Sequence, residues 1–339
     1  MLTYIIRRVL GGLGLLVAVS MITFGIFFVV PRLAGETPEI MASRYVGSRA
    51  SSDQYHLVAE RLGFYDPLWL QYWHWLKAIF VGMDFDYGNG VEHCAAPCFG
   101  YSYLKSTPVW PDLIDRAGVT MSLAIGAAVI WVLFGVSTGV VSALRRGSVF
   151  DRAAMSVALA GVSLPIFFTG LVSLVVFSYG RPFRFTAPGS SYVSFAKNPA
   201  EWAYDLILPW VTLAFLFAAS YARLTRAGML ETMHEDYVRT ARAKGLPERT
   251  VVVKHGLRAA LTPIVTIFGL DLGLLLGGAV LTESTFSLPG LGKYAVDAVM
   301  RQDFPQVMGV TMFATFFIVV ANIVVDVLYG VVDPRVRVG

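Results

Sequence analysis

Three short patterns match enzyme motifs, and each fails in the residues around it. Residues 135–139 read GVSTG, the Gly-x-Ser-x-Gly of serine hydrolases, but they lie inside an uncharged run, 117–144, whereas that motif needs a strand, a sharp turn and a helix. GLGK, ending at Lys293, lacks the first glycine of a phosphate-binding loop and is followed by Tyr294 instead of Ser or Thr. HEDYV lacks the second histidine of a zinc-protease motif. The sequence therefore indicates neither a catalytic site nor a nucleotide-binding loop.

The two cysteines, Cys94 and Cys98, lie in HCAAPC, within a polar segment between the first two apolar runs. If this segment is extracytoplasmic, its thiols meet an oxidising environment, so a local disulfide is the leading interpretation. Free thiols and a metal site that includes His93 are the alternatives. Three candidate ligands are too few for a closed zinc site, so no metal site is predicted.

Asp271 and Pro165 stand out inside apolar runs. A carboxylate near the middle of a membrane span is costly, so Asp271 should face a helix-bundle interior, water or a partner protein. If the chain is a transporter, a polar contact that lines its path is favoured over proton coupling. Pro165 frees backbone groups and predicts a kink. Because kinks both line transport paths and serve packing, Pro165 is a candidate path residue with packing as the alternative.

The composition is that of an integral membrane protein. Of 339 residues, 56% are hydrophobic and 15% are charged, and the mean hydropathy is +0.63. About 20 helical residues cross the ~30 Å hydrocarbon core. Six runs approach or exceed that length, the fourth being the shortest: 9–31, 117–144, 153–180, 206–222, 259–282 and 304–325. We therefore expect an all-α fold with six membrane spans.

The lysines and arginines orient these spans. With the N-terminus in the cytosol, 15 of the 27 basic residues fall on the inner side and 15 of the 23 acidic residues on the outer side. The positive-inside rule thus places both termini in the cytosol. The first run is longer than the core of a typical signal peptide and is expected to remain as an anchor. The net charge of +4 is too small to indicate a nucleic-acid partner, and membrane lipid is the expected surrounding.

These runs suggest three parts. Residues 1–31 hold the cytosolic N-terminal end and the first span, 32–116 form an extracytoplasmic segment, and 117–339 form a core of five spans with a cytosolic loop at 223–262.

The extracytoplasmic segment contains two recognisable stretches. Ser51, Ser52 and Asp53 predict the start of a capped helix that ends at Gly63. The aromatic stretch 69–76 is suited either to lying at lipid headgroups or to packing in a small subdomain.

The stretch 236–263 combines many cationic residues with a helical pattern between two apolar runs. Val238, Ala241, Arg242 and Gly245 fall at i, i+3, i+4 and i+7, on one face of a short predicted helix. Gly245 should end that helix and Pro247 should begin the next, which predicts a sharp bend. The small residues on this face are suited to entering a groove on another protein, with the basic residues orienting the partner.

The same stretch, YVRTARAKG followed by HGLRAALTP, resembles the cytoplasmic coupling loop of B-type permease subunits of bacterial ABC importers for peptides and nickel. Further blocks match in order along nearly the whole chain: MLTYIIRRV, LKSTPVWPDLIDRAGVTMSLA, LRRGSVFDRAA, SLPIFFTG, LTESTFSLPGLGKY and VDVLYGVVDPRVR. The broader superfamily often has Glu-Ala-Ala six residues before the loop glycine, whereas this chain has Arg239, Thr240 and Ala241. The insertion around the two cysteines is where the resemblance is weakest.

This resemblance implies the six-span fold of type I ABC importer permeases, in the bacterial inner membrane. It implies a homologous C-type permease, two ATPase subunits and an extracytoplasmic binding protein as partners, with ATP and Mg on the ATPases and no cofactor on this chain. The ATPase-coupling residues would be Tyr237, Val238, Arg239, Thr240, Ala241, Arg242, Ala243, Lys244 and Gly245.

The resemblance further implies that the cargo is short peptides. The alternatives are nickel chelates or other solutes of the same family, and, from a different class, a self-sufficient secondary transporter for which Asp271 is the single supporting feature. An intramembrane hydrolase lacks candidate residues.

Overall fold

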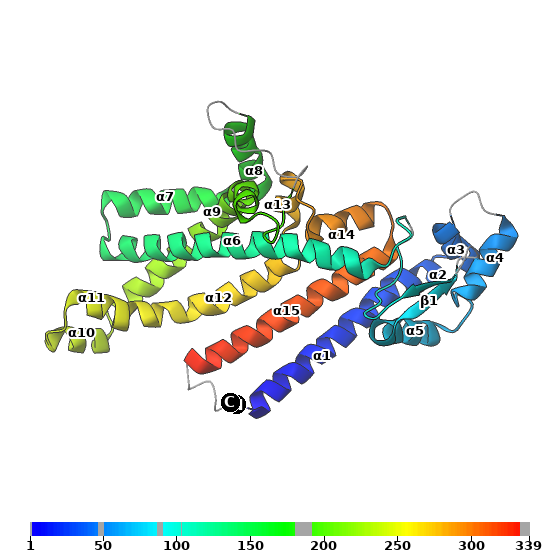
Figure 1. Ribbon diagram of the computed structural model, residues 1–339. Helices are drawn as coiled ribbons and strands as arrows, with labels where there is room; N and C mark the ends of the chain where they lie inside the picture. Colours follow the sequence, from blue (N-terminus) through cyan, green and yellow to red (C-terminus); the bar gives the residue numbers. More distant parts are fainter. Residues whose placement is uncertain (1, 47–50, 87–90, 103, 180–191, 333–339) are drawn as a thin grey trace. The chain divides into compact units, whose positions relative to one another are not determined.

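The computed structural model describes residues 2–46, 51–86, 91–102, 104–179 and 192–332 and is mostly helical (Figure 1). The chain folds into two compact units. The first comprises Met1–Arg8, Gly118–Lys293 and Val320–Gly339, and the second comprises Val9–Ala117 and Tyr294–Val319. The second unit thus groups parts of the first and last spans with the segment between the first two spans, a division that differs from the boundaries expected after residues 31 and 116.

Among the described residues, five helices are long and apolar enough to cross a membrane, and a bent pair of helices makes a sixth candidate span. They are Ile6–Leu33, Val109–Leu144, Pro199–Thr232, Glu248–Leu276, Phe304–Val325 and the pair Val149–Ser163 with Ile166–Ser178. Each apolar run of the sequence corresponds to one of these candidates. The expected all-α membrane fold is confirmed.

The first unit holds the helices between residues 118 and 293. Its elements are α6 (Val109–Leu144, from Gly118 on), α7 (Val149–Ser163), α8 (Ile166–Leu174), the π-helix η2 (Val175–Tyr179), α9 (Pro199–Thr232), α10 (Asp236–Ala243), α11 (Glu248–Thr250), the π-helix η3 (Val251–Leu257), α12 (Arg258–Leu276), α13 (Val280–Thr285) and the start of α14 (Leu291–Met300). The short helices α10 and α11 lie where α9 ends and η3 leads into α12 (Figure 1).

Helix α9 is much longer than the fourth apolar run. Asn198 caps its N-terminus, with Pro199 at the first helical position, and the helix continues for 34 residues, about 50 Å. It passes through Pro209 and beyond Arg226 to Thr232. The uncharged run 206–222 ends at a charged residue on each side. A helix needs apolar residues only where lipid surrounds it, so α9 continues past these charges and is longer than the run.

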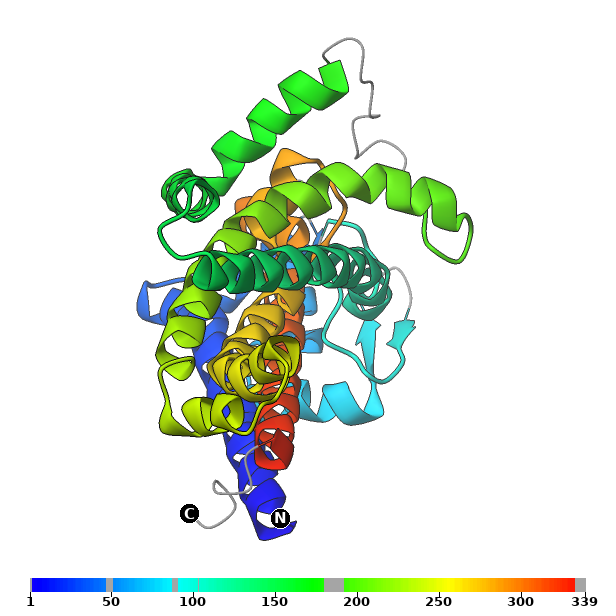
Figure 2. The ribbon, with the colours of Figure 1, turned by 90° about the vertical axis from the view of Figure 1, so that its left-hand side faces the viewer.

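The third span breaks at Pro165, as the sequence predicted. Pro165 is the N-cap of α8 with an extended backbone, and the axes of α7 and α8 differ by 103°. In Figure 2, α7 is seen almost end-on while α8 rises away from it. Proline lacks the N–H that would continue the hydrogen bonds of α7, so the chain starts a second helix in a new direction.

Glycines on α6 let α9 approach closely. A Cβ atom on Gly135 would lie 2.8 Å from the Tyr221 Cβ, and one on Gly139 would lie 2.5 Å from the Thr225 Cβ. This confirms the helix contact expected from GVSTG. The core around it contains the fully buried Trp131, whose ring stacks on that of Phe217 at 4.6 Å between centroids.

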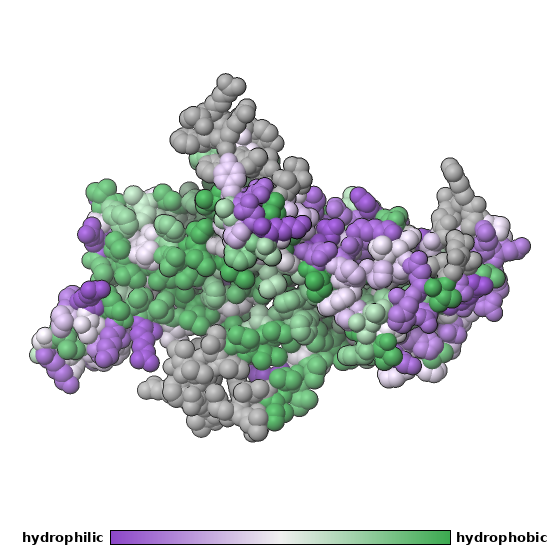
Figure 3. Space-filling view, viewed as in Figure 1, coloured by the Kyte–Doolittle hydropathy of each residue, from purple (hydrophilic) through white to green (hydrophobic). Residues whose placement is uncertain are grey.

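The outward surface of the first unit is strongly apolar. Leu133 and Phe134 on α6, and Val157 and Leu159 on α7, are large apolar side chains that are exposed. Figure 3 shows apolar residues spread over this helical face and hydrophilic residues gathered at α10 and α11. Such a surface suits lipid over the long helices and water at the short ones.

The second unit contains the remaining elements. These are most of α1 (Leu2–Phe24), the π-helix η1 (Gly25–Val29), α2 (Val30–Leu33), α3 (Pro38–Val46), α4 (Ser52–Arg61), α5 (Leu68–Val81), the strands β1 (Met83–Asp86) and β2 (Val91–Cys94), the start of α6, most of α14 and the first half of α15 (Phe304–Val332).

Helix α4 is the capped helix that the sequence predicted. The Ser51 hydroxyl accepts from the Gln54 N–H, and the Gln54 side chain accepts from the Ser51 N–H, which completes a capping box. The chain turns at Gly63, where φ is +69°. The aromatic stretch lies in α5, where the Tyr72 ring packs on that of Phe24 and Trp69 is exposed. The first contact supports packing in a subdomain, and the position at lipid headgroups stays a prediction.

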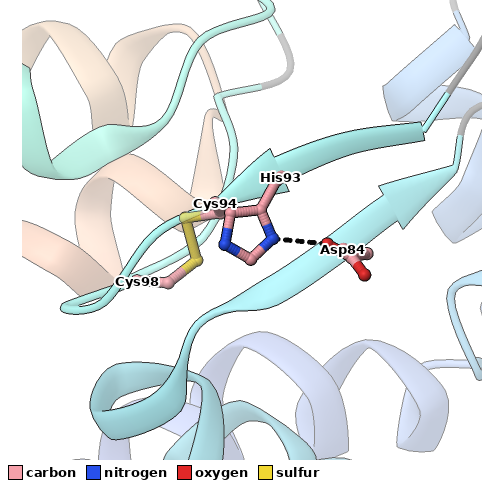
Figure 4. The surroundings of a disulfide bond; sticks show 4 residues. All are labelled: Asp84, His93, Cys94 and Cys98. Atoms are coloured by element: carbon pink, nitrogen blue, oxygen red, sulfur yellow. Dashed lines mark hydrogen bonds and ion pairs between the residues drawn. A yellow bond between two sulfur atoms is a disulfide. The ribbon is translucent and has the colours of Figure 1, made fainter.

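A small antiparallel hairpin follows α5, in the insertion where the resemblance was weakest. β1 pairs with β2 so that Met83 lies opposite Cys94 and Asp84 opposite His93. Figure 4 shows the disulfide that joins Cys94 to Cys98 and, beside it, the contact between the His93 Nδ1 and the Asp84 Oδ1 at 2.5 Å. His93 thus contacts a carboxylate across the hairpin. Among the described residues, this hairpin is the one sheet, and an isolated antiparallel bridge joins Tyr101 to Pro108.

Candidate functional site

Residues 233–247, here named the α10 loop, connect α9 to α11 and contain the sharp bend that the sequence predicted. Gly245 has φ of +75°, which L-residues with side chains rarely adopt. The Gly245 N–H donates to the Arg242 carbonyl at 2.9 Å and the Leu246 N–H donates to the Ala241 carbonyl at 3.4 Å. These two bonds form a Schellman cap, and Pro247 then caps α11. The loop is shorter than the expected range 223–262 because α9 and η3 continue the flanking helices.

Two residues of the predicted small-residue face, Val238 and Ala241, point inward, which corrects the expectation that they enter a partner, whereas Arg242 and Gly245 are exposed. Val238 and Ala241 are 0% and 5% exposed. They form a cluster with the buried Val251 of η3 and the partly buried Met233 at the end of α9. Burying apolar atoms here holds the short helix against its own chain. The sequence pattern identified an apolar face correctly and assigned it to the wrong neighbour.

The other side of α10 is exposed to solvent. Tyr237 is 46% exposed, and burial of the remainder raises the pKa of its hydroxyl. Arg239, Thr240, Ala243 and Lys244 are also exposed. This side combines cations, a hydroxyl, a short side chain and an aromatic ring, and it is the part of the α10 loop that a partner can reach.

Arg242 closes the loop across the bend. Its Nη2 and Nε donate to the two carboxylate oxygens of Glu248 at 2.8 and 3.2 Å. This hydrogen bond raises the pKa of the Arg242 guanidinium. Both side chains are largely exposed, so the pair orders the turn more than it stabilises the fold.

A shallow groove of about 440 Å³ lies beside the α10 loop. Its apolar lining comes from the ends of α6 and α9, and its polar lining includes Arg146, His234, Arg239 and Arg242 opposite Glu248. Three arginines in one groove make it attractive to an acidic or helix-C-terminal group of a partner.

The α6–α7 connection is fixed to α9 next to this groove. Arg226 donates from Nε and Nη2 to the two carboxylate oxygens of Asp151, at 2.7 and 2.8 Å. Asp151 also accepts from the Gly147 N–H at 2.9 Å and is almost fully buried. This paired geometry joins the start of α7 to the last turns of α9.

Asp271 on α12 meets α9 within the apolar core. The Tyr221 hydroxyl donates to the Asp271 Oδ2 at 2.9 Å, and both residues line a groove between the two helices. Pro165, the other candidate path residue, is exposed at the α7–α8 bend and is not among the residues that line this groove. The structure therefore does not bring the two candidate path residues into one site.

Glu283 on α13 is a site that sequence reasoning missed. Its side chain is 0% exposed, and its carboxylate accepts from the Thr120 hydroxyl at 2.8 Å, the Ala279 N–H at 3.2 Å and the Lys293 N–H at 2.9 Å. The Thr120 hydroxyl in turn accepts from the Leu291 N–H at 2.9 Å. These bonds join α6, α13 and α14, so residues 277–293 form a closed turn, named here the Glu283 turn.

The signal for this site was in the sequence block TESTFSLPGLGK. A Cβ atom on Gly290 would lie 2.3 Å from the Glu283 carboxyl carbon, so only glycine fits beside the carboxylate. A glutamate followed seven residues later by Gly290 and then by Gly292 could have indicated a carboxylate capped by backbone N–H groups.

Comparison with known proteins identifies the family. Residues 132–338 match the family described as "Binding-protein-dependent transport system inner membrane component", and residues 1–124 match the N-terminal part of such membrane components. The chain belongs to this family. The resemblance of the chain to bacterial peptide permeases is thereby confirmed.

Named relatives cover the chain from end to end. The dipeptide transport system permease protein DppB of Escherichia coli K12 is 35% identical, and the di/tripeptide transport system permease protein DppB of Pseudomonas aeruginosa UCBPP-PA14 is 37% identical. A putative peptide transport system permease protein of Brucella abortus 2308 is 36% identical. Each alignment covers 99% of this chain and 99% of the relative.

The family and the fold together make the chain a multi-pass membrane permease subunit of a transport system. The α10 loop, the Arg226–Asp151 pair and the Asp271–Tyr221 pair all lie in the first unit, within residues 118–293. The disulfide lies in the second unit. These intramolecular polar contacts thus lie in the segment that the family model matches, residues 132–338.

Proposed function

We propose that this chain forms half of the translocation path of an ABC importer for short peptides. It pairs with a homologous C-type permease, receives cargo from an extracytoplasmic binding protein and is driven by two ATPase subunits that carry ATP and Mg. The chain itself hydrolyses nothing. The naming of the three relatives as peptide permeases supports the cargo class.

One observation carries the proposed coupling. The buried side of α10 packs on Met233, at the end of α9, and on Val251, in the segment that leads into α12. A displacement of α10 is therefore passed to both helices, and these two helices meet at the Tyr221–Asp271 contact. Close packing transmits such displacements because buried side chains have no free volume to absorb them.

The coupling surface in this proposal is the outer side of Tyr237–Gly245, in the cytosol with both chain termini. Val238 and Ala241 contribute by holding α10 on the bundle. Tyr237, Arg239, Thr240, Ala243 and Lys244 contribute by contacting the ATPase, with the basic groove beside them attracting acidic groups.

The test is reconstitution of the complex in proteoliposomes with a labelled dipeptide. We expect uptake that requires ATP, the binding protein and the ATPase subunits. Uptake that follows a proton gradient without ATPases would favour a secondary transporter, and uptake of a nickel chelate but of no peptide would reassign the cargo.

The orientation is tested separately by labelling Lys244→Cys in intact cells. The native cysteines are joined in a disulfide, so the introduced thiol is the reactive one in the chain. A membrane-impermeant maleimide should label it only after the membrane is opened. Labelling in intact cells would contradict a cytosolic α10 loop and the coupling proposal with it.

A further inference from the structure

The groove between α9 and α12 has a volume of about 530 Å³. Most of its wall is apolar, and its polar atoms come from Ser220, Tyr221, Arg223 and Asp271. A polar group inside a largely apolar wall is costly unless it has a partner, so these four residues are the part of the groove that can hydrogen-bond to a ligand.

Only one of the two carboxylate oxygens of Asp271 accepts a hydrogen bond in the described part of the chain. Its Oδ2 accepts from the Tyr221 hydroxyl, and in the described part of the chain no hydrogen bond to its Oδ1 and no cation within ion-pair distance is present. A carboxylate accepts several hydrogen bonds, so Oδ1 remains available to a donor in the groove. A cationic donor is preferred, because it also neutralises the charge.

The carboxylate is held in place before any ligand arrives. The Tyr221 ring is buried beside Trp131 at 6.2 Å between ring centroids, and Gly135 closes the space behind the Tyr221 Cβ. The Tyr221 hydroxyl therefore has little freedom, and its hydrogen bond orients Asp271 toward the groove. Such preorganisation lowers the entropic cost of binding.

Arg223 gives the same groove a charge of the opposite sign. Its side chain is exposed, and within the described residues it forms no ion pair with Asp271 or with any other carboxylate. A bare metal ion or a proton needs Asp271 alone and is repelled by a guanidinium, whereas a simple anion is repelled by Asp271. A ligand that carries both an ammonium and a carboxylate satisfies both.

We propose that Asp271, oriented by Tyr221, binds the α-ammonium group of a peptide in transit and that Arg223 binds its α-carboxylate. This subsite rests on the proposed function, since it assumes that peptides are the cargo. The subsite binds the two charged termini that all unmodified short peptides share and does not select for their side chains. It thus explains how one path accepts many sequences.

The test uses the whole reconstituted complex with Ser220→Cys in this chain. Ser220 lines the groove, and the disulfide leaves the introduced thiol as the reactive one in the chain. Alkylation by a small maleimide is followed by the mass of this chain. Dialanine at high concentration should slow alkylation about tenfold, the ratio that a charged hydrogen bond supports.

Four comparisons decide the assignment. Adding Asp271→Asn should remove the protection by dialanine, and N-acetyl-dialanine should not protect the unmodified groove. Adding Arg223→Gln should weaken protection by dialanine and leave that by dialanine amide unchanged. Asp205→Asn, a buried carboxylate of α9 that does not line the groove, is the matched control and should leave the protection intact.

The inference is overturned if dialanine does not protect, if Asp271→Asn protects as well as the parent, or if the acetylated peptide protects equally. Loss of the partner permease from the complex in Asp271→Asn would also overturn it, because the carboxylate would then serve a subunit contact. Each of these results is compatible with ATP-dependent dipeptide uptake by the unmodified complex. Absence of that uptake instead contradicts the proposed function, so the two failures are distinguishable.

Discussion

The α10 loop and the Glu283 turn both belong to the first unit and are built in opposite ways. In the Glu283 turn a fully buried carboxylate accepts three hydrogen bonds, and the backbone folds around it. In the α10 loop one side of a two-turn helix is buried, and the other side leaves Tyr237 and Arg239 exposed. A turn whose buried polar groups are all hydrogen-bonded within the chain is rigid. A turn with exposed cations and an exposed aromatic ring is suited to binding a partner.

The largest expected effect comes from removing the carboxylate of the Glu283 turn. Glu283→Ala leaves the Thr120 hydroxyl and the Ala279 and Lys293 N–H groups without an acceptor, at a cost of at least ~3 kcal/mol in the free energy of unfolding. Thermal unfolding of the detergent-solubilised chain measures it. Glu283→Gln keeps the size and one acceptor oxygen and should lose less. If the alanine variant is as stable as the parent, the turn is not the rigid joint inferred here.

The two sides of α10 are compared by placing the same bulky residue on each. Ala241→Leu overfills the cluster with Val251 and should cost ~1–3 kcal/mol. Ala243→Leu, two residues on and exposed, should leave the thermal stability unchanged while reducing co-purification of the ATPase subunits. Equal loss of stability in the two variants would show that the side of α10 with Ala243 also packs against the rest of the chain.

The sequence predicted the spans, the loop and its bend because each depends on local chemistry. The length of a run without charged residues indicates a membrane span. Gly245 followed by Pro247 indicates that one helix ends and the next begins. The break at Pro165 follows from the missing N–H in the same way.

What the sequence could not show is which neighbour a face contacts. The pattern at Val238 and Ala241 identifies an apolar side, but only the path of the chain brings Val251 against it. The spacing of Glu283 and its two glycines could have indicated the local backbone contacts, but the contact with Thr120, 163 residues away, could not be predicted from the sequence. The closeness of Tyr221 to Asp271, 50 residues apart, likewise depends on the packing of α9 on α12.

A smaller effect should follow from Gly245→Ala. No atom lies within 4 Å of the added Cβ, so the cost is the left-handed backbone alone, about 1–2 kcal/mol. Gly245→Asn, which tolerates this conformation, is the control and should recover most of the stability. Thermal unfolding measures the loss of stability, and co-purification of the ATPase subunits is measured on the same variants. If alanine and asparagine give equal losses, a contact made by the glycine backbone accounts for the effect instead.

The smallest effect on stability, and the sharpest separation of the two regions, is expected from Arg242→Gln. The pair with Glu248 is exposed on both sides, 41% and 59%, so solvent screens it and thermal unfolding should not change measurably. The same change removes one of three arginines from the groove beside the loop, so association with the ATPase subunits should slow and lose part of its dependence on salt concentration. Association rates at low and high salt measure this, with Arg301→Gln, an exposed arginine of the second unit, as the control. A variant that unfolds earlier while binding normally would assign Arg242 to the fold, and the α10 loop would then resemble the Glu283 turn more than a docking surface.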